Sequence, residues 1–290
     1  MAFERNKSMS LRVDTGAERP IWIRRGREQL LGILSLPDQS RDLGVVLFTG
    51  GGWMPSTHRN RMYVDLARDL AGMGCTVMRF DYTGVGDSTG ETKYFDFVAP
   101  HIADALAAVE TVRATGVSRV MMVGTCYGGR TALAAAKSVG DLVGLVLVAS
   151  PVEDYGGGST FGQKASSPTS AFKLARTRYP KYIRVVKARL SRAVRIREAE
   201  TSDPVSPKYL QALSEVLSRG VRVLLLEGTL DKHHPSHVAA LTGRLGSLLT
   251  AHRDLVATAE IDGELHGELS MEGQMFTRER VSEFVASFVS

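Results

Sequence analysis

A cysteine between glycines is the residue in this chain best suited to chemistry. Cys126 stands at the centre of G-x-C-x-G-G, residues 124–129, after the apolar run 120–123 and before a stretch rich in helix formers. This order predicts a strand, a sharp turn and a helix, with the side chain of Cys126 projecting from the turn. Glycines two residues to either side suit a turn with no room for a Cβ atom. The positive end of the following helix predicts a thiol more acidic than a free cysteine.

The elements around this turn alternate between strand and helix. Short apolar runs are typical of strands buried in a parallel sheet, and the stretches between them have helical periodicity. The pattern predicts an α/β fold, a mostly parallel sheet with helices on both faces and an antiparallel opening at 21–36. The expected strands are 45–48, 77–80, 120–123, 142–148, 221–226 and 255–261, and the expected helices are 59–73, 97–114, 236–249 and 277–288.

The alternation breaks at Pro151 and returns at Val221. We interpret residues 151–219 as a helical cap insertion, and residues 1–150 and 220–290 as the core domain. At 290 residues, one domain with an insertion is the default expectation.

The composition argues against an exported, membrane-spanning, metal-binding or nucleotide-binding protein. The charged start predicts no signal peptide, and no apolar run approaches the roughly 18 residues of a membrane span. The only two cysteines, Cys75 and Cys126, form no C-x-x-C pattern, so we expect reduced thiols in the cytoplasm and no metal site. Cys75 is expected in the core. Gly84 and Gly86 lack the third glycine of a dinucleotide fingerprint, so we expect no cofactor.

The sequence resembles the α/β-hydrolase superfamily from about Glu28 to the C-terminus. The resemblance lies in the turn GTCYGG, the glycine loop TGGGW, the stretch DYTGVGDSTG, and the order of nucleophile, acid and histidine. The insertion falls where that family places its cap. Cysteine replaces the usual serine, and in this respect the turn is similar to that of dienelactone hydrolases.

The resemblance implies a catalytic triad. A nucleophilic cysteine needs a base, and the base needs a carboxylate that fixes its tautomer. In the family the acid follows the strand after the cap, which indicates Asp231, and the histidine lies after the last strand, which indicates His266. Asp154 is the alternative acid. The remaining histidines at helix ends are expected at the surface: His58, His101 and His252.

Further site residues follow from the same comparison. The backbone N–H groups of Gly51 and Tyr127 are expected to form an oxyanion hole, although glycines in a tight turn could also explain the loop at 50–52. Trp53 and His233 are candidates for contact with the substrate. For Cys126 the alternative interpretation is a small buried hydrophobic residue.

Together these residues predict acyl transfer through an acyl-enzyme on Cys126. Our first hypothesis is a thioesterase or acyltransferase, because a thioester intermediate exchanges readily with a thioester substrate. The alternative is an ester or lactone hydrolase of the dienelactone hydrolase kind. A non-catalytic binding protein that kept the fold is a third hypothesis.

The basic character of the chain is local. Residues 173–197 carry ten basic and no acidic side chains, whereas the whole chain has a net charge of +5. An apolar stripe on the same expected helix indicates that the basic faces point outward. A solvated face, an anionic membrane surface, and an acyl carrier protein or coenzyme A thioester are the competing interpretations, and a position in the cap favours the last. Nothing else in the sequence favours nucleic acid.

Overall fold

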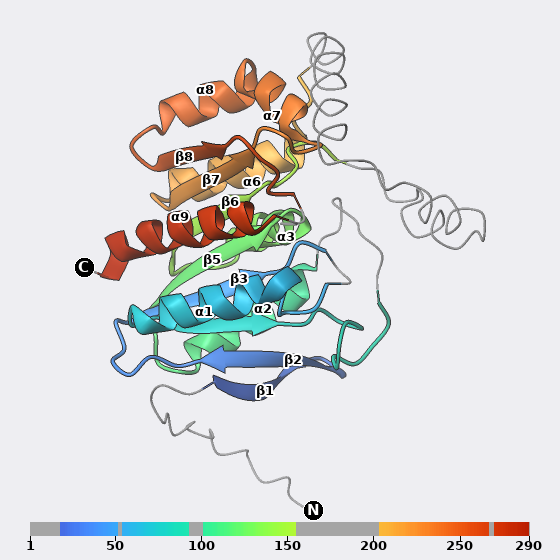
Figure 1. Cartoon of the computed structure of the whole chain (residues 1–290), viewed down its shortest axis with the longest axis vertical. Coiled ribbons are helices and arrows are strands. Elements are labelled where there is room, and N and C mark those ends of the chain that lie inside the picture. The colour runs from blue at the N-terminus through green and yellow to red at the C-terminus, as the bar shows by residue number, and fades with distance from the viewer. Residues whose placement is uncertain (1–17, 52–53, 93–100, 155–202, 267–269, 290) are drawn as a thin grey trace, which may run out of the picture.

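The computed structural model describes residues 18–51, 54–92, 101–154, 203–266 and 270–289. Within these ranges an eight-stranded sheet has the order β1-β2-β4-β3-β5-β6-β7-β8 (Figure 1). Its strands are β1 (Glu18–Arg25), β2 (Glu28–Ser35), β3 (Leu43–Phe48), β4 (Thr76–Phe80), β5 (Arg119–Thr125), β6 (Leu142–Val148), β7 (Arg222–Gly228) and β8 (Val256–Ile261). The helices are η1 (Arg59–Arg61), α1 (Met62–Gly72), α2 (Ile102–Arg113), α3 (Tyr127–Ala136), α6 (Pro207–Ser218), α7 (His234–Leu241), α8 (Arg244–Ala251) and α9 (Met271–Val289).

The sheet is parallel apart from its opening. β1 and β2 form an antiparallel hairpin that turns at Gly26, whose φ of 64° is left-handed. β2 also pairs antiparallel with β4, whereas all pairs from β4 through β3 to β8 are parallel. The predicted mostly parallel sheet with an antiparallel opening is therefore confirmed.

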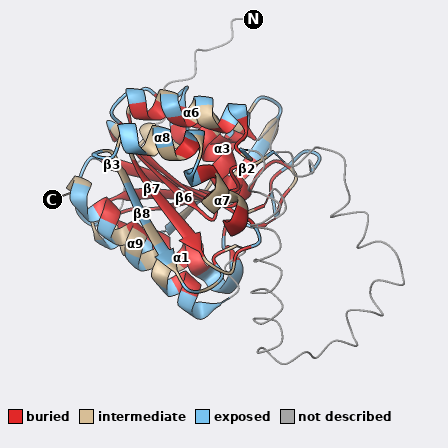
Figure 2. Ribbon diagram, turned by 90° about the horizontal axis from the view of Figure 1, so that it is seen from above, coloured by how far each residue is buried: buried red, intermediate tan, exposed pale blue. Residues whose placement is uncertain are grey.

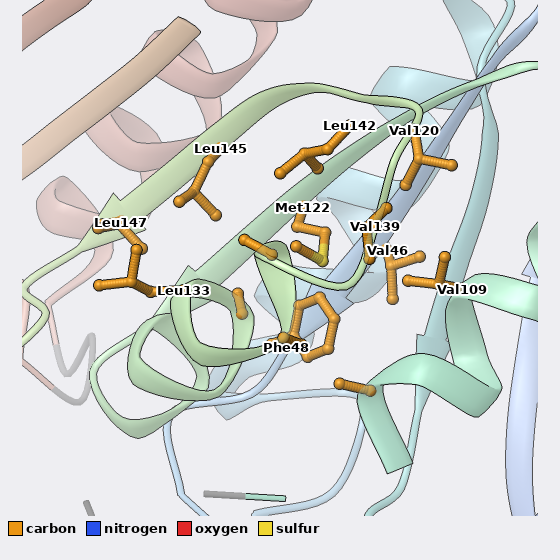
Figure 3. Close-up of a cluster of buried hydrophobic side chains, with 14 of the residues drawn as sticks. Val46, Phe48, Val109, Val120, Met122, Leu133, Val139, Leu142, Leu145 and Leu147 are labelled. Carbon is orange, nitrogen blue, oxygen red and sulfur yellow. The ribbon is translucent and has the colours of Figure 1, made fainter. Parts of the chain in front are cut away.

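Helices cover both faces of the sheet because its central strands are apolar on both faces. Val46 and Phe48 of β3 point into the core cluster beneath α2, α3 and α6, which Figure 3 shows in close-up. Val45 and Leu47 point into the opposite cluster beneath α1 and α9. Figure 2 shows the buried strands between helices whose outward faces are exposed. Full burial of each such side chain contributes about 1.5–3 kcal/mol, so this alternation fixes the layers.

The helices after β7 differ from the sequence prediction. The helix expected at 236–249 is two helices, α7 and α8, because the chain breaks at Gly243, the N-cap of α8. The last helix begins at Met271, earlier than expected.

The segment assigned to a cap insertion is described only at its ends. Its last part forms α6, which packs against α3 and buries Tyr209 and Leu213 in the core. Residues 155–202 lie outside the described ranges. A helical cap therefore remains a prediction for those residues alone, and α6 belongs with the core.

The parallel strands place the candidate site residues at one edge of the sheet. β3, β5, β6, β7 and β8 all run in the same direction, so their carboxyl ends meet at a single edge of the sheet. Ligand sites of open α/β sheets lie outside this edge. The loops that follow these strands carry Gly51, Cys126, Asp154, Asp231 and His266.

Candidate active site

Cys126 lies in a strained turn between β5 and α3. Its φ of 50° and ψ of −113° are rare for a residue with a Cβ atom, and such conformations cost about 1–3 kcal/mol. The turn is held because the Cys126 N–H donates to the Val148 carbonyl at 2.8 Å and the Cys126 carbonyl accepts from the Arg130 N–H at 3.3 Å. Strain maintained by the surroundings in this way is typical of functional residues.

The flanking glycines are required by close backbone approach. A Cβ atom on Gly128 would lie 2.1 Å from the carbonyl oxygen of Phe48, and one on Gly124 would lie 2.5 Å from the backbone of Gly128. Both distances are shorter than any normal contact between these atoms. The turn therefore has no room for side chains at these positions, as the spacing predicts.

The thiol of Cys126 is buried, with 3% of the residue exposed. Burial raises its pKa to about 12, and a hydrogen bond from the Tyr127 N–H lowers it only in part. The nearby charge of Asp231 also acts to raise it. The prediction of an acidic thiol is therefore wrong, because desolvation outweighs the helix N-terminus. Cys75 is fully buried, as expected, and burial raises its pKa to about 12.

Asp231 fastens the loop that carries His266. It follows β7, and its Oδ1 accepts hydrogen bonds from the backbone N–H groups of His266 at 2.6 Å and Leu265 at 2.8 Å. Its Oδ2 accepts from the Gly228 N–H at 3.1 Å. Burial raises the pKa of Asp231 to about 7 despite these donors. The structure thus brings the two residues together through the backbone of His266.

The imidazole of His266 is neutral in this arrangement. Burial lowers its pKa to about 4, and the neighbouring His233 and Lys232 act in the same direction. Among the described residues, its buried Nδ1 has no hydrogen-bond partner. The bond between this nitrogen and Asp231 that a triad uses is not formed here. Catalytic hydrogen bonds often tighten only when substrate binds.

Asp154, the alternative acid, is engaged elsewhere. Its carboxylate lies 2.5 Å from Nη2 of Arg130 and accepts from Ser206 Oγ at 2.7 Å. The same arginine donates to the carbonyls of Pro151 and Glu153. Asp154 therefore ties α3 to the chain on both sides of residues 155–202 and makes no bond to His266 among the contacts described.

The start of the glycine loop, Gly50 and Gly51, lies beside the sharp turn at Cys126, which we call the elbow. The Gly51 carbonyl accepts from the Met54 N–H at 3.0 Å, and a Cβ atom on Gly50 would lie 3.4 Å from the carbonyl oxygen of Thr125. Tyr127 is the first residue of α3, where backbone N–H groups have no partner within the helix. Trp53 lies outside the described residues, so its expected contact with substrate stays a prediction.

His233 lies against the ring of His266, with the ring centroids 4.9 Å apart and nearly perpendicular. Its Nδ1 is 3.3 Å from Oε1 of Glu153, a residue that the sequence analysis did not single out. In the sequence Glu153 follows the strand expected at 142–148 by five residues. This position near the carboxyl edge of the sheet could have indicated it as a site residue. His233 thus lies beside the ring of His266, and its contact with substrate remains a prediction.

Two histidines expected at the surface are buried. His58 is 5% exposed and lies beside the glycine loop, and burial lowers its pKa to about 4. His101 is 8% exposed, and its Nδ1 lies 3.2 Å from Oδ2 of Asp104. Their positions at helix ends suggested exposure, but each ring packs against buried tyrosines: His58 against Tyr63, and His101 against Tyr82 and Tyr127.

In the described part of the chain, no group of three or more His, Cys, Asp or Glu side chains could hold a metal ion. No helix in these ranges is long and apolar enough to cross a membrane.

Comparisons with known proteins identify the family and the fold. Residues 45–260 match the model of an alpha/beta hydrolase family. No curated protein matches the sequence. An esterase from Pyrococcus furiosus is similar in structure, with a TM-score of 0.62 and 15% identity over 94% of this chain and 91% of that one.

Two further solved structures are similar at comparable coverage. Est1E from Butyrivibrio proteoclasticus, solved with ferulic acid bound, has a TM-score of 0.59 and 15% identity over 93% of this chain and 99% of that one. A serine hydrolase without a lid from Xanthomonas campestris has a TM-score of 0.55 and 17% identity over 93% and 94%. The family model covers most of the sheet and its carboxyl edge, and on that match the chain belongs to the α/β-hydrolase family.

Proposed function

We propose that this protein hydrolyses small carboxylic esters, lactones included, through an acyl intermediate on Cys126, with His266 as the base and Asp231 as its orienting acid. The observation that carries the proposal is the strained elbow of Cys126 at the edge where Asp231 binds the loop of His266. The similarity to an esterase and to a protein that binds ferulic acid supports an ester substrate over a thioester.

Acylation starts from a neutral thiol and a neutral imidazole. Sγ of Cys126 bonds to the ester carbonyl carbon while the thiol proton passes to Nε2 of His266. The carbonyl oxygen becomes an oxyanion that accepts from the N–H groups of Gly51 and Tyr127. The carbon–oxygen bond then breaks, and the imidazolium returns the proton to the leaving alkoxide. Asp231 stabilises the transient imidazolium once Nδ1 of His266 turns toward it.

Deacylation repeats the steps with water. His266 takes a proton from water as the oxygen bonds to the acyl carbon, and the tetrahedral intermediate then expels Sγ. The proton on His266 returns to sulfur, so Cys126 ends as a thiol. A pKa of about 12 suits this cycle, because the proton leaves the sulfur during attack and not beforehand.

Thioester chemistry is a second candidate, and the observation that favours it is the thiol itself. A cysteine forms a thioester intermediate, which is close in energy to a thioester substrate and can be captured by an amine or an alcohol. The docking of a carrier protein or coenzyme A would rest on residues 173–197. These residues lie outside the described ranges, so that partner stays a prediction.

The test is the intact mass of the protein after incubation with p-nitrophenyl acetate, dihydrocoumarin and acetyl-coenzyme A. Wild type and Cys75→Ala should gain one acetyl group from p-nitrophenyl acetate, and Cys126→Ala should gain none. Turnover of the two oxygen esters should exceed that of the thioester. Acylation by acetyl-coenzyme A alone would favour the second candidate. No acylation and no turnover with any compound would favour a non-catalytic binding protein.

A further inference from the structure

Tyr63 makes a buried polar contact that the proposed mechanism does not use. It is the second residue of α1 and has no exposed surface. Its hydroxyl donates to the carbonyl oxygen of Phe48 at 2.8 Å and lies 2.7 Å from Oγ1 of Thr125. The tyrosine hydroxyl has a single hydrogen, which it donates to the Phe48 carbonyl. The Thr125 hydroxyl is therefore the donor to the tyrosine oxygen.

The two partners of this hydroxyl are the last residues of neighbouring strands. Phe48 ends β3 and leads into the glycine loop with Gly51, while Thr125 ends β5 and leads into Cys126. The strands pair in parallel, with Phe48 opposite Gly124. Tyr63 therefore links β3 and β5 at their carboxyl ends, where the backbone hydrogen bonds between the two strands stop.

The region around Tyr63 is packed against the glycine loop. The ring of His58 lies on the ring of Tyr63, with centroids 4.9 Å apart. A Cβ atom on Gly50 would lie 3.5 Å from Nε2 of His58 and 3.4 Å from the carbonyl oxygen of Thr125. Gly50 therefore lies close to both His58 and Thr125.

The backbone of the residues just before α1 is strained. His58, Asn60 and Arg61 all have left-handed φ values, 58°, 49° and 62°, and none is glycine. Such strain persists only where surrounding contacts hold it, and it gathers at functional sites. These residues lead directly into α1, whose second residue is Tyr63.

We propose that Tyr63 is a positioning residue that fixes the separation between the two donors of the oxyanion hole. This inference rests on the proposed acyl transfer. The N–H groups of Gly51 and Tyr127 belong to different chain segments, three residues after Phe48 and two after Thr125. An oxyanion is stabilised only by donors within about 2.7–3.1 Å of it, so a small drift of one segment weakens one donor.

The test compares Tyr63→Phe, which removes only the hydroxyl, with Thr125→Val, which removes the other hydroxyl at nearly constant volume. Each should lower kcat for p-nitrophenyl acetate by about 10- to 100-fold, less than the ~10²–10³-fold typical of losing a donor outright. KM should change by less than about twofold, because the donors act mainly in the transition state. The double variant should lose little more than either single one, since both remove the same link.

A second readout separates positioning from general structural damage. Alkylation of Cys126 by iodoacetamide uses no oxyanion hole, so its rate should match wild type in Tyr63→Phe while acylation slows. Tyr209→Phe, a change at a buried tyrosine in the opposite helical layer, is the matched control and should leave kcat unchanged. Thermal denaturation checks that each variant is folded.

The outcomes are distinct. An unchanged kcat in Tyr63→Phe, with active wild type, would overturn the inference and leave the proposed function standing. Equal losses of acylation and alkylation would also overturn it, since they indicate damage to the nucleophile itself. If Tyr63→Phe does not fold, the same criteria apply to Thr125→Val. A wild-type protein that no ester or thioester acylates would overturn both proposals together.

Discussion

Cys126 combines a reactive position with an unreactive resting state. Its backbone is strained into the elbow, yet its thiol is buried and burial raises its pKa to about 12. A thiolate is therefore scarce at neutral pH until a base takes the proton. The proposed mechanism therefore relies on His266 as the base, and not on the N-terminus of α3, to activate Cys126.

This balance predicts how Cys126 responds to pH. In Cys75→Ala, where it is the only thiol, alkylation by iodoacetamide should accelerate about tenfold per pH unit from pH 7 to 9.5, because only the thiolate reacts. Mass spectrometry of the alkylated protein against time measures the rate. A plateau below pH 8 would contradict the raised pKa and would indicate a stabilised thiolate.

The same argument predicts that serine can replace the nucleophile. In Cys126→Ser the hydroxyl is also neutral at rest, and His266 can remove its proton during attack. Ester hydrolysis in this variant should be at least about 10-fold above that of Cys126→Ala, measured as kcat/KM with p-nitrophenyl acetate. Equal rates in the two variants would mean that the site needs a preformed thiolate.

At the scale of elements, the elbow depends on the contact between α3 and the end of β3. A Cβ atom on Gly128 would overlap the Phe48 carbonyl oxygen, which belongs to the backbone and cannot rotate away. Gly128→Ala should destabilise the protein by about 1–3 kcal/mol, as overpacking does, and remove most of the activity. Urea denaturation and kcat measure the two effects.

Gly140→Ala is the control for that change. Among the described residues, and apart from its two neighbours in the chain, no atom lies within 4 Å of where its Cβ would be, and its φ is not left-handed. Its stability should stay within about 0.5 kcal/mol of wild type, as at most surface sites. A similar loss in both variants would mean that glycine flexibility, and not the contact at Phe48, accounts for the effect.

The elements could be predicted from sequence because their signals are local. The glycines around Cys126 and the apolar runs of the central strands each lie within a few residues, and both predictions are confirmed for the elbow and the sheet. The pKa of the thiol could not be predicted, because burial depends on what packs over it. The link from Tyr63 to Thr125 joins residues 62 apart, and no local pattern records it.

At the scale of the whole molecule, the carboxyl edge gathers buried titratable groups with opposite effects on stability. Burial lowers the pKa of His58, His237 and His266 to about 4, below the 6.5 of an ordinary histidine. Burial raises the pKa of Asp231 to about 7 and that of Glu227 well above its usual range. The three histidines and Asp231 are therefore held mainly neutral in the folded protein near pH 6.

The two classes respond to pH with opposite signs. Between pH 6.5 and 4 the unfolded chain binds protons on histidines that the folded protein keeps neutral, so each histidine makes stability fall as pH falls. Between about pH 4 and 7 the folded protein keeps Asp231 protonated while the unfolded chain releases that proton, so this group makes stability fall as pH rises. The two classes therefore oppose one another across this window.

Single substitutions should therefore separate the two contributions. The stability of His58→Asn relative to wild type should increase as pH falls from 6.5 to 4, and that of Asp231→Asn should increase as pH rises from 4 to 7. Each change should be at most about 1.4 kcal/mol per pH unit, the linkage of one proton. Urea denaturation of the three proteins at half-unit steps measures the differences. Parallel curves for wild type and His58→Asn would mean that the imidazole is not held neutral beneath the glycine loop, because only a histidine with a lowered pKa takes up a proton on unfolding in this window.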